Sequence, residues 1–220
     1  MSLLSFETGN IYNGDCLDII KKWPDNCVDL VITDPPYGMN YHSNHYKDGN
    51  VHKPILGDDC FPIDTIKECF RIARCAVLSF CRWNNLKDIP PPKSFIVWAK
   101  NNWTAGDLEH EYGRSWEGIA FWPMEGHQFN LKRPSDLYDF RKIPSSSLNH
   151  PTEKPISIMS RLIDANVGDI ILDPYCGSGS TLVAAERLGR KWVGIEIDKD
   201  YCAVAERRIS DERSQLRMFP

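Results

Sequence analysis

The sequence lacks a long apolar run. None of its hydrophobic stretches approaches the roughly 20 residues that a helix needs to cross a bilayer. Its first five residues have neither the basic segment nor the apolar core of a signal peptide. We therefore expect no membrane partner and a cytoplasmic location.

The sequence also lacks a metal-binding or disulfide pattern and an excess of positive charge. Its eight cysteines include no C-x-x-C pair, which disfavours both a zinc site and a disulfide framework, and we interpret them as free thiols. The net charge is −4, from 26 basic and 30 acidic residues, which excludes a wholly basic nucleic-acid coat. A nucleic-acid partner would therefore require a local positive patch.

What is present fits a single domain spanning residues 1–220, with 42% hydrophobic and 25% charged residues. Alternation of strand and helix patterns at both ends predicts an α/β fold with a parallel sheet. Short apolar runs predict strands at 11–13, 28–33, 76–80, 95–98, 118–122, 169–172 and 192–197. Helical spacing and capping predict helices at 17–22, 156–163, 181–188 and 198–208.

A glycine-rich segment, Asp173 to Thr181, lies between a predicted strand and a predicted helix. Small residues there let backbone N–H groups approach a ligand at the start of the helix. Glu196 ends the next predicted strand, where a carboxylate can hold the two hydroxyls of a ribose. The segment lacks the Gly-Lys-Ser/Thr ending that binds a triphosphate, so a ligand with a ribose but no phosphates fits best. A tight turn beside a surface acid is the alternative.

A second motif, Asp34-Pro35-Pro36-Tyr37, directly follows the predicted strand 28–33. The prolines restrict the backbone, so the Asp34 carboxylate and the Pro35 carbonyl can be held in one arrangement. Two such acceptors suit the two hydrogens of an exocyclic NH₂ group, while Tyr37 can stack on the face of a base. A polyproline turn with a packed tyrosine is the alternative interpretation.

These two motifs and the segment His150 to Pro155 together resemble the amino-methyltransferases of DNA, in the order of their beta group: catalytic motif first, recognition region in the middle, glycine-rich loop last. The resemblance covers the first forty and the last seventy residues. It implies a Rossmann-like fold with a seven-stranded, mostly parallel sheet. It also implies a circular permutation, in which the helix after Glu196 would lead into the strand 11–13 if the chain ends were joined.

The resemblance implies S-adenosyl-L-methionine as the cofactor. Within its site, Glu196 would bind the ribose, Asp15 the adenine, and the segment containing Lys154 the methionine carboxylate. The implied catalytic residues are Asp34, Pro35, Pro36 and Tyr37. The implied cofactor-binding residues are Asp15, Cys16, Asp34, His150, Thr152, Lys154, Asp173, Tyr175, Gly177, Ser178, Gly179, Ser180, Thr181, Glu196 and Ile197.

The implied reaction is methyl transfer to N6 of adenine in double-stranded DNA, after the base is flipped out of the helix. An aspartate at position 34 favours adenine, because relatives that methylate cytosine N4 more often carry serine there. Cytosine N4, an RNA or protein-glutamine substrate, and a non-catalytic cofactor-binding module remain the alternatives. The host would be a bacterial or phage-infected cell.

Residues 41–149 match no recognition domain, and we expect them to contain a lid and a DNA-recognition insertion. His42, His45 and His52 indicate a lid rather than a metal site. The basic stretch from Lys132 to Lys142, joined by Lys100 and Arg114, could contact phosphates or form a solvated loop. A chain of this size has little material for reading DNA, so a homodimer is a further expectation, and a cognate restriction endonuclease is another candidate partner.

Overall fold

The computed structural model describes residues 6–38, 46–47, 50–51, 59–100, 109–110, 112–130, 132–140 and 153–218. Its main sheet has eight strands in the order β1-β10-β9-β2-β5-β7-β6-β8. β7 is antiparallel to both of its neighbours, and the other adjacent strands run parallel. The strands are β1 (Asn10–Asn13), β2 (Val28–Thr33), β5 (Ala73–Cys81), β6 (Ser94–Ala99), β7 (Trp116–Pro123), β8 (Leu137–Asp139), β9 (Ile170–Asp173) and β10 (Lys191–Glu196).

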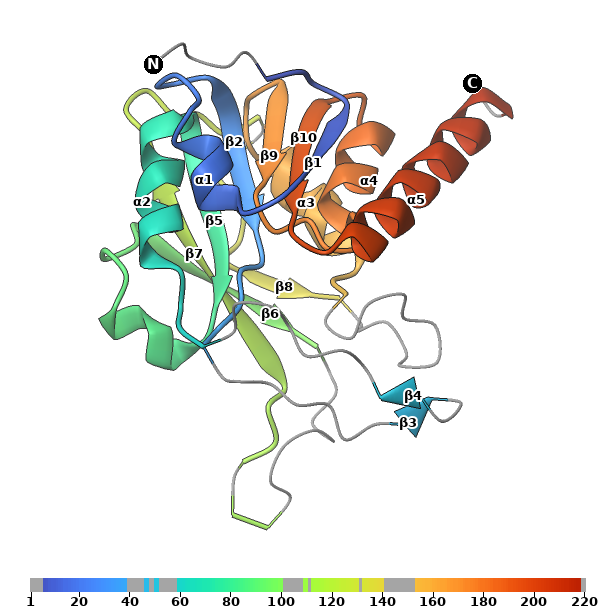
Figure 1. Ribbon diagram of the computed structural model, residues 1–220. Coiled ribbons are helices and arrows are strands. Elements are labelled where there is room, and N and C mark those ends of the chain that lie inside the picture. The colour runs from blue at the N-terminus through green and yellow to red at the C-terminus, as the bar shows by residue number, and fades with distance from the viewer. Residues whose placement is uncertain are drawn as a thin grey trace.

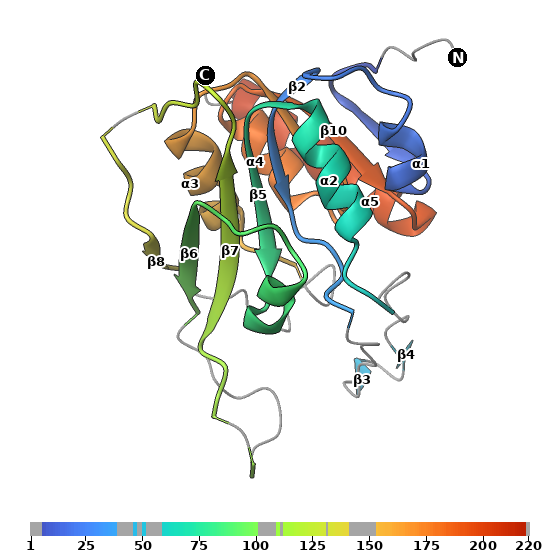
Figure 2. The ribbon, with the colours of Figure 1, turned by 90° about the vertical axis from the view of Figure 1, so that its left-hand side faces the viewer.

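Helices cover both faces of this sheet (Figures 1 and 2). On one face lie α1 (Cys16–Ile20) and α2 (Ile63–Ile72), and on the other lie α3 (Ile156–Ala165), α4 (Ser180–Arg187) and α5 (Lys199–Met218). A short 3-10 helix, η1 (Trp83–Lys87), follows β5, and β3 (Tyr46–Lys47) pairs with β4 (Asn50–Val51) in a separate small sheet. The architecture is the predicted Rossmann-like α/β fold.

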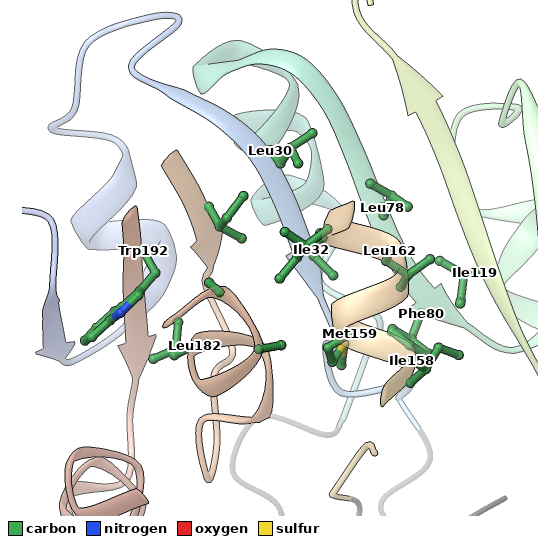
Figure 3. Close-up of a cluster of buried hydrophobic side chains, with 14 of the residues drawn as sticks. Leu30, Ile32, Leu78, Phe80, Ile119, Ile158, Met159, Leu162, Leu182 and Trp192 are labelled. Atoms are coloured by element: carbon green, nitrogen blue, oxygen red, sulfur yellow. The ribbon is translucent and has the colours of Figure 1, made fainter. Parts of the chain in front are cut away.

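Two hydrophobic clusters bury the two faces of the sheet. Because side chains alternate along a strand, Leu30 and Ile32 of β2 pack toward α3 and α4, whereas Val31 packs toward α1 and α2. Figure 3 shows Ile32 beside Met159 and Leu162 of α3. The face of α3 predicted from its apolar spacing is therefore the one that is buried.

The predicted number of strands was wrong, since the main sheet has eight strands and not seven. The additional strand, β8, has three residues, of which only Tyr138 is buried. So short a strand has no alternation to detect. The helix α2 was also missed, although its buried positions Ile66, Cys69 and Ile72 have helical spacing.

The circular permutation agrees with the pairing of the chain ends. β1 lies beside β10 in parallel, with Asn13 opposite Glu196, so the N-terminal strand continues the sheet where the C-terminal strands end. Within the described residues, no helix is both long and apolar enough to span a membrane.

β2 and β9 are neighbours, with Val31 opposite Leu172. The strand that follows β2 in the sheet, β5, lies on one side of this pair, whereas the strand that follows β9, β10, lies on the opposite side. The boundary between β2 and β9 is therefore the topological switch point, where open α/β sheets bind ligands beyond the carboxyl ends of the strands.

Candidate active site

The two sequence motifs meet at this switch point. Asp34 directly follows β2, and Asp173 ends β9, the adjacent parallel strand. Glu196 ends β10, the next strand along, and Asp15 lies two residues beyond β1. The structure thus brings the predicted site residues of four consecutive strands to one edge of the sheet.

Asp173 fixes the start of the glycine-rich loop. Its side chain accepts hydrogen bonds from the Tyr175 backbone N–H at 3.1 Å and from the Thr181 hydroxyl at 2.6 Å. The residue is only 3% exposed, and burial raises the pKa of its carboxyl to about 7. Asp173 is therefore a buried turn-forming group that joins the end of β9 to the start of α4.

Glu196 holds the middle of the same loop. One carboxylate oxygen accepts a hydrogen bond from the Gly177 N–H at 2.8 Å, and the other accepts from the Asp198 N–H at 2.8 Å. Burial raises the pKa of Glu196, against the effect of these amides. Gly177 and Gly179 have φ values of 51° and 85°, which favour glycine. The acid at the end of β10 and the loop after β9 therefore form one unit.

Asp15 caps α1 by accepting a hydrogen bond from the Asp18 N–H at 3.1 Å. The neighbouring Cys16 is buried, and its Sγ lies 3.7 Å from the hydroxyl of Thr65 on α2. That hydroxyl also accepts a hydrogen bond from Tyr175 at 3.0 Å. Thr65 thus connects the loops after β1 and β9, a role that the sequence analysis missed.

The serine residues of the loop face the protein. Arg208 of α5 donates hydrogen bonds to the Ser178 carbonyl at 2.7 Å and to its hydroxyl at 2.8 Å, and the Ser180 hydroxyl lies 3.4 Å away. Arg208 also pairs with Glu153 at 2.7 Å. Ile197, by contrast, is 50% exposed beside the loop. Arg208 therefore supports the loop from behind, and this residue was not predicted.

Asp34 lies at the centre of a second group of contacts. One carboxylate oxygen, Oδ1, accepts a hydrogen bond from the Tyr37 hydroxyl at 2.6 Å, and the other, Oδ2, accepts from the Lys154 ammonium at 2.5 Å. Pro35 is buried and Pro36 half-buried. The Tyr37 carbonyl accepts a hydrogen bond from the Asn85 side chain at 3.2 Å, which ties the motif to η1.

The contacts continue beyond Lys154. Its Nζ lies 3.3 Å from Oε2 of Glu117 on β7, and Oε1 of Glu117 lies 2.8 Å from the ammonium of Lys100. Burial raises the pKa of Asp34, although Lys154 opposes this. Burial would also raise the pKa of Glu117, but the two lysines outweigh it and hold this pKa at about 2. Opposite charges therefore alternate through Asp34, Lys154, Glu117 and Lys100, and we call these four residues the ion chain.

The structure adds a contact of Lys154 that the sequence did not predict. The resemblance groups it with His150 and Thr152 at the methionine carboxylate, but its ammonium here contacts the catalytic motif. His150 and Thr152 lie outside the described residues, as do His42, His45 and His52. The residues that the structure describes contain no cluster of potential metal ligands.

The proposed phosphate contacts are not all available on the surface. Tyr138 is 7% exposed and belongs to the hydrophobic core, and Lys100 is paired with Glu117. Arg133 lines a cavity of about 520 Å³ beside Ala165 at the end of α3, whereas Lys154 lies before the start of that helix. Arg141 and Lys142 lie outside the described residues.

The geometry suits a transfer between two bound groups. A carboxylate beside an aromatic ring at the end of β2 can orient an amine. An acid and backbone amides at the ends of β9 and β10 can hold a ligand with a ribose. Because β2 and β9 are adjacent, the two groups would react at the boundary between them.

Comparison with known proteins agrees with the family resemblance of the sequence motifs. Residues 99–207 match the N6_N4_Mtase family model, described as DNA methylase. The DNA adenine methyltransferase YhdJ of Escherichia coli is 28% identical, over 92% of this chain and 83% of its own length. The type II methyltransferase M.BglII of Bacillus subtilis is 24% identical, over 96% of this chain and 71% of its own length.

Solved structures agree with this result. The crystal structure of the M1.HpyAVI–SAM complex is 26% identical and superposes with a TM-score of 0.69, over 90% of this chain and 98% of that one. Together with the family match and the meeting of the motifs at the switch point, this likeness leads to one conclusion. The chain belongs to the family of N6- and N4-specific DNA methylases.

Proposed function

We propose that the chain transfers a methyl group from S-adenosyl-L-methionine to N6 of adenine in double-stranded DNA. The observation that carries the proposal is the adjacency of β2 and β9, which places the Asp34 motif beside the glycine-rich loop. The likeness to YhdJ, named a DNA adenine methyltransferase, supports the choice of base. The geometry thus supports transfer to an exocyclic amine, and the relationship to YhdJ supports adenine as the base.

The donor set of the loop fits S-adenosyl-L-methionine. Glu196 offers carboxylate oxygens at the end of β10, held in place by two backbone amides, and these would accept hydrogen bonds from the ribose hydroxyls. The half-exposed Ile197 would cover one face of the cofactor adenine, and Asp15 would read its edge. When bound, the cofactor supplies an activated methyl group on its sulfonium. The M1.HpyAVI–SAM complex, whose name includes this ligand, supports the assignment.

Asp34 would orient the target amine. Its carboxylate accepts one N–H and the Pro35 carbonyl the other, which directs the nitrogen lone pair toward the methyl group. As the N–C bond formed, the bond between the methyl carbon and the sulfonium sulfur would break with its electron pair left on sulfur. Positive charge would develop on the amine, Asp34 would stabilise that charge, and the amine would then lose one proton to water. Alignment of the reacting atoms supplies a further part of the acceleration. No cysteine nucleophile is needed, because the amino nitrogen attacks directly.

A duplex hides the amino group within its stack, so the base must flip into the site, at a cost of a few kcal/mol. Tyr37 would stack on the flipped base, and its hydroxyl is already fixed by Asp34 at 2.6 Å. Methylation of cytosine N4 would use the same geometry and is distinguished by the product.

The role of Asp34 is tested by Asp34→Ala, with Asp211→Ala on the exposed face of α5 as the matched control. Removal of the orienting carboxylate is expected to lower kcat for DNA methylation by at least about 100-fold. Calorimetry with S-adenosyl-L-methionine on the same variant separates a loss of the chemical step from a loss of cofactor binding. A variant that retains the wild-type kcat would exclude Asp34 from the reaction.

We also propose the partners that the family suggests. The likeness to M.BglII, named a type II methyltransferase, supports a cognate restriction endonuclease that cuts the same site. A homodimer is a second proposed partner, and gel filtration with and without DNA tests it. The bacterial cytoplasm, where the DNA lies, is the corresponding location.

A further inference from the structure

The ion chain places a protein amine where the substrate amine must bind. Asp34 has two carboxylate oxygens, of which Oδ1 accepts from Tyr37 and Oδ2 from the Lys154 ammonium at 2.5 Å. A lysine ammonium and the amino group of a base donate the same kind of N–H hydrogen bond. The Lys154 ammonium therefore takes the position on Asp34 that the proposed target amine needs.

For the target amine to reach Oδ2, the Lys154 ammonium has to move. Its side chain is only 7% exposed, so an ammonium released without a new partner would be a buried, unpaired charge. Leaving one member of such a buried pair without an opposite charge is strongly unfavourable. A substrate that had to meet this cost would bind poorly in the reactive position.

Glu117 offers the ammonium a second acceptor at short range. Its Oε2 is buried and accepts no hydrogen bond from the residues that the structure describes, yet it lies 3.3 Å from Lys154 Nζ. Its other oxygen is occupied by Lys100 at 2.8 Å, which holds the carboxylate in place. A small shift of the flexible lysine side chain would thus replace the Asp34 contact with one to Glu117.

The surroundings of the ammonium direct this shift. Lys154 Nζ lies 5.1 Å from the centre of the Phe80 ring and 5.8 Å from that of Tyr37. Figure 3 shows Phe80 in the core beside Ile158, so this ring is fixed by packing. Aromatic faces attract a cation but give it no directed acceptor. The two carboxylates are therefore the alternative positions of the charge.

We propose that Glu117 is a positioning residue that receives the Lys154 ammonium when the target amine takes its place on Asp34. The inference rests on the proposed function, since it assigns the response of that same site to its substrate. The shift moves no proton, so the ion chain keeps two positive and two negative groups throughout. The Lys154 ammonium donates to Asp34 Oδ2 before the base binds and donates to Glu117 once the base is in place.

The test compares Glu117→Gln, Lys154→Met and the double variant, with Glu206→Gln on the exposed face of α5 as control. Without the Glu117 charge, Lys154 stays on Asp34, and kcat at saturating cofactor is expected to fall at least tenfold while cofactor affinity stays within twofold. Removing the competing ammonium as well should restore activity. The double variant is therefore expected to be at least threefold faster than Glu117→Gln and to match Lys154→Met.

A double variant no faster than Glu117→Gln, or a Glu117→Gln variant within twofold of wild type, would overturn the inference, because a merely structural Glu117 would give additive losses. If Glu117→Gln does not fold, Glu117→Asp serves in its place. The aspartate keeps the negative charge but holds it one methylene further from Lys154. The kcat of Glu117→Asp is then compared with that of the Glu117→Asp, Lys154→Met double variant, with the same expected fold-changes. A wild-type protein that methylates no base would instead refute the proposed function itself.

Discussion

Asp173 makes the stability of this protein depend on pH in a way that one substitution should remove. The carboxyl is 3% exposed, and burial raises its pKa to about 7, against an ordinary value of 3.8. Asparagine has nearly the same shape and cannot ionise. In Asp173→Asn, the side-chain oxygen can still accept from the Tyr175 N–H, and the new NH₂ group can donate to the Thr181 hydroxyl.

The size of the effect follows from the two pKa values. The folded carboxyl holds its proton to a higher pH than the unfolded one, so wild-type stability is fully present below pH 3.8 and is lost as pH rises toward about 7. Each pKa unit corresponds to about 1.4 kcal/mol, so the loss over the whole window is at most about 4 kcal/mol. Between pH 5 and pH 8 it is roughly 3 kcal/mol.

The assay is urea unfolding of the wild type and Asp173→Asn at pH 5 and pH 8, with Asp211→Asn on the exposed face of α5 as control. When the pH is raised from 5 to 8, the free energy of unfolding of the wild type is expected to fall by roughly 3 kcal/mol relative to that of Asp173→Asn. The control variant should show the same pH dependence as the wild type. If the difference in stability between Asp173→Asn and the wild type does not change with pH, the Asp173 carboxyl does not have a raised pKa in the folded protein.

Three further substitutions test the loop and its supports. Gly179→Ala should lower the free energy of unfolding by about 2–4 kcal/mol, as measured by urea unfolding, since its Cβ would lie 2.8 Å from that of Ala205 and φ is 85°. Glu196→Gln should raise the cofactor Kd by roughly 10- to 100-fold in calorimetry. Glutamine has a single oxygen, so one of the two backbone amides loses its acceptor, and the ribose hydroxyls lose a charged acceptor. Arg208→Met should lower the melting temperature clearly, because it removes the ion pair with the buried Glu153 and the hydrogen bonds to the Ser178 carbonyl and hydroxyl.

The sheet core could be predicted because its strands carry a strong local signal. Val28–Thr33 was predicted at its observed bounds, since five of its six residues are buried and proline follows it almost immediately. β8 gave no such signal, because Tyr138 alone is buried among three residues. The last helix was predicted to end at Arg208 but continues to Met218, because its final turns are mostly polar and solvent-exposed.

The site could be predicted only where its residues are consecutive. Asp34 to Tyr37 and Asp173 to Thr181 are short motifs, whereas Glu117, Thr65 and Arg208 reach the site from separate elements through tertiary contacts. The one local sign for Glu117 was a charged residue within a strand whose following residues are apolar. A charge at such a position generally needs a buried partner, but the sequence alone does not say that the partner is Lys154.

Analysis of the methylated product decides whether the chain transfers a methyl group to N6 of adenine. Unmethylated duplex DNA of mixed sequence is incubated with the wild-type protein and isotopically labelled S-adenosyl-L-methionine, digested to nucleosides, and analysed by mass spectrometry. Labelled N6-methyldeoxyadenosine is expected from the wild type and is expected to be absent from the Asp34→Ala reaction. Labelled N4-methyldeoxycytidine in its place, or no labelled nucleoside from a protein that binds the cofactor, would contradict methyl transfer to N6 of adenine.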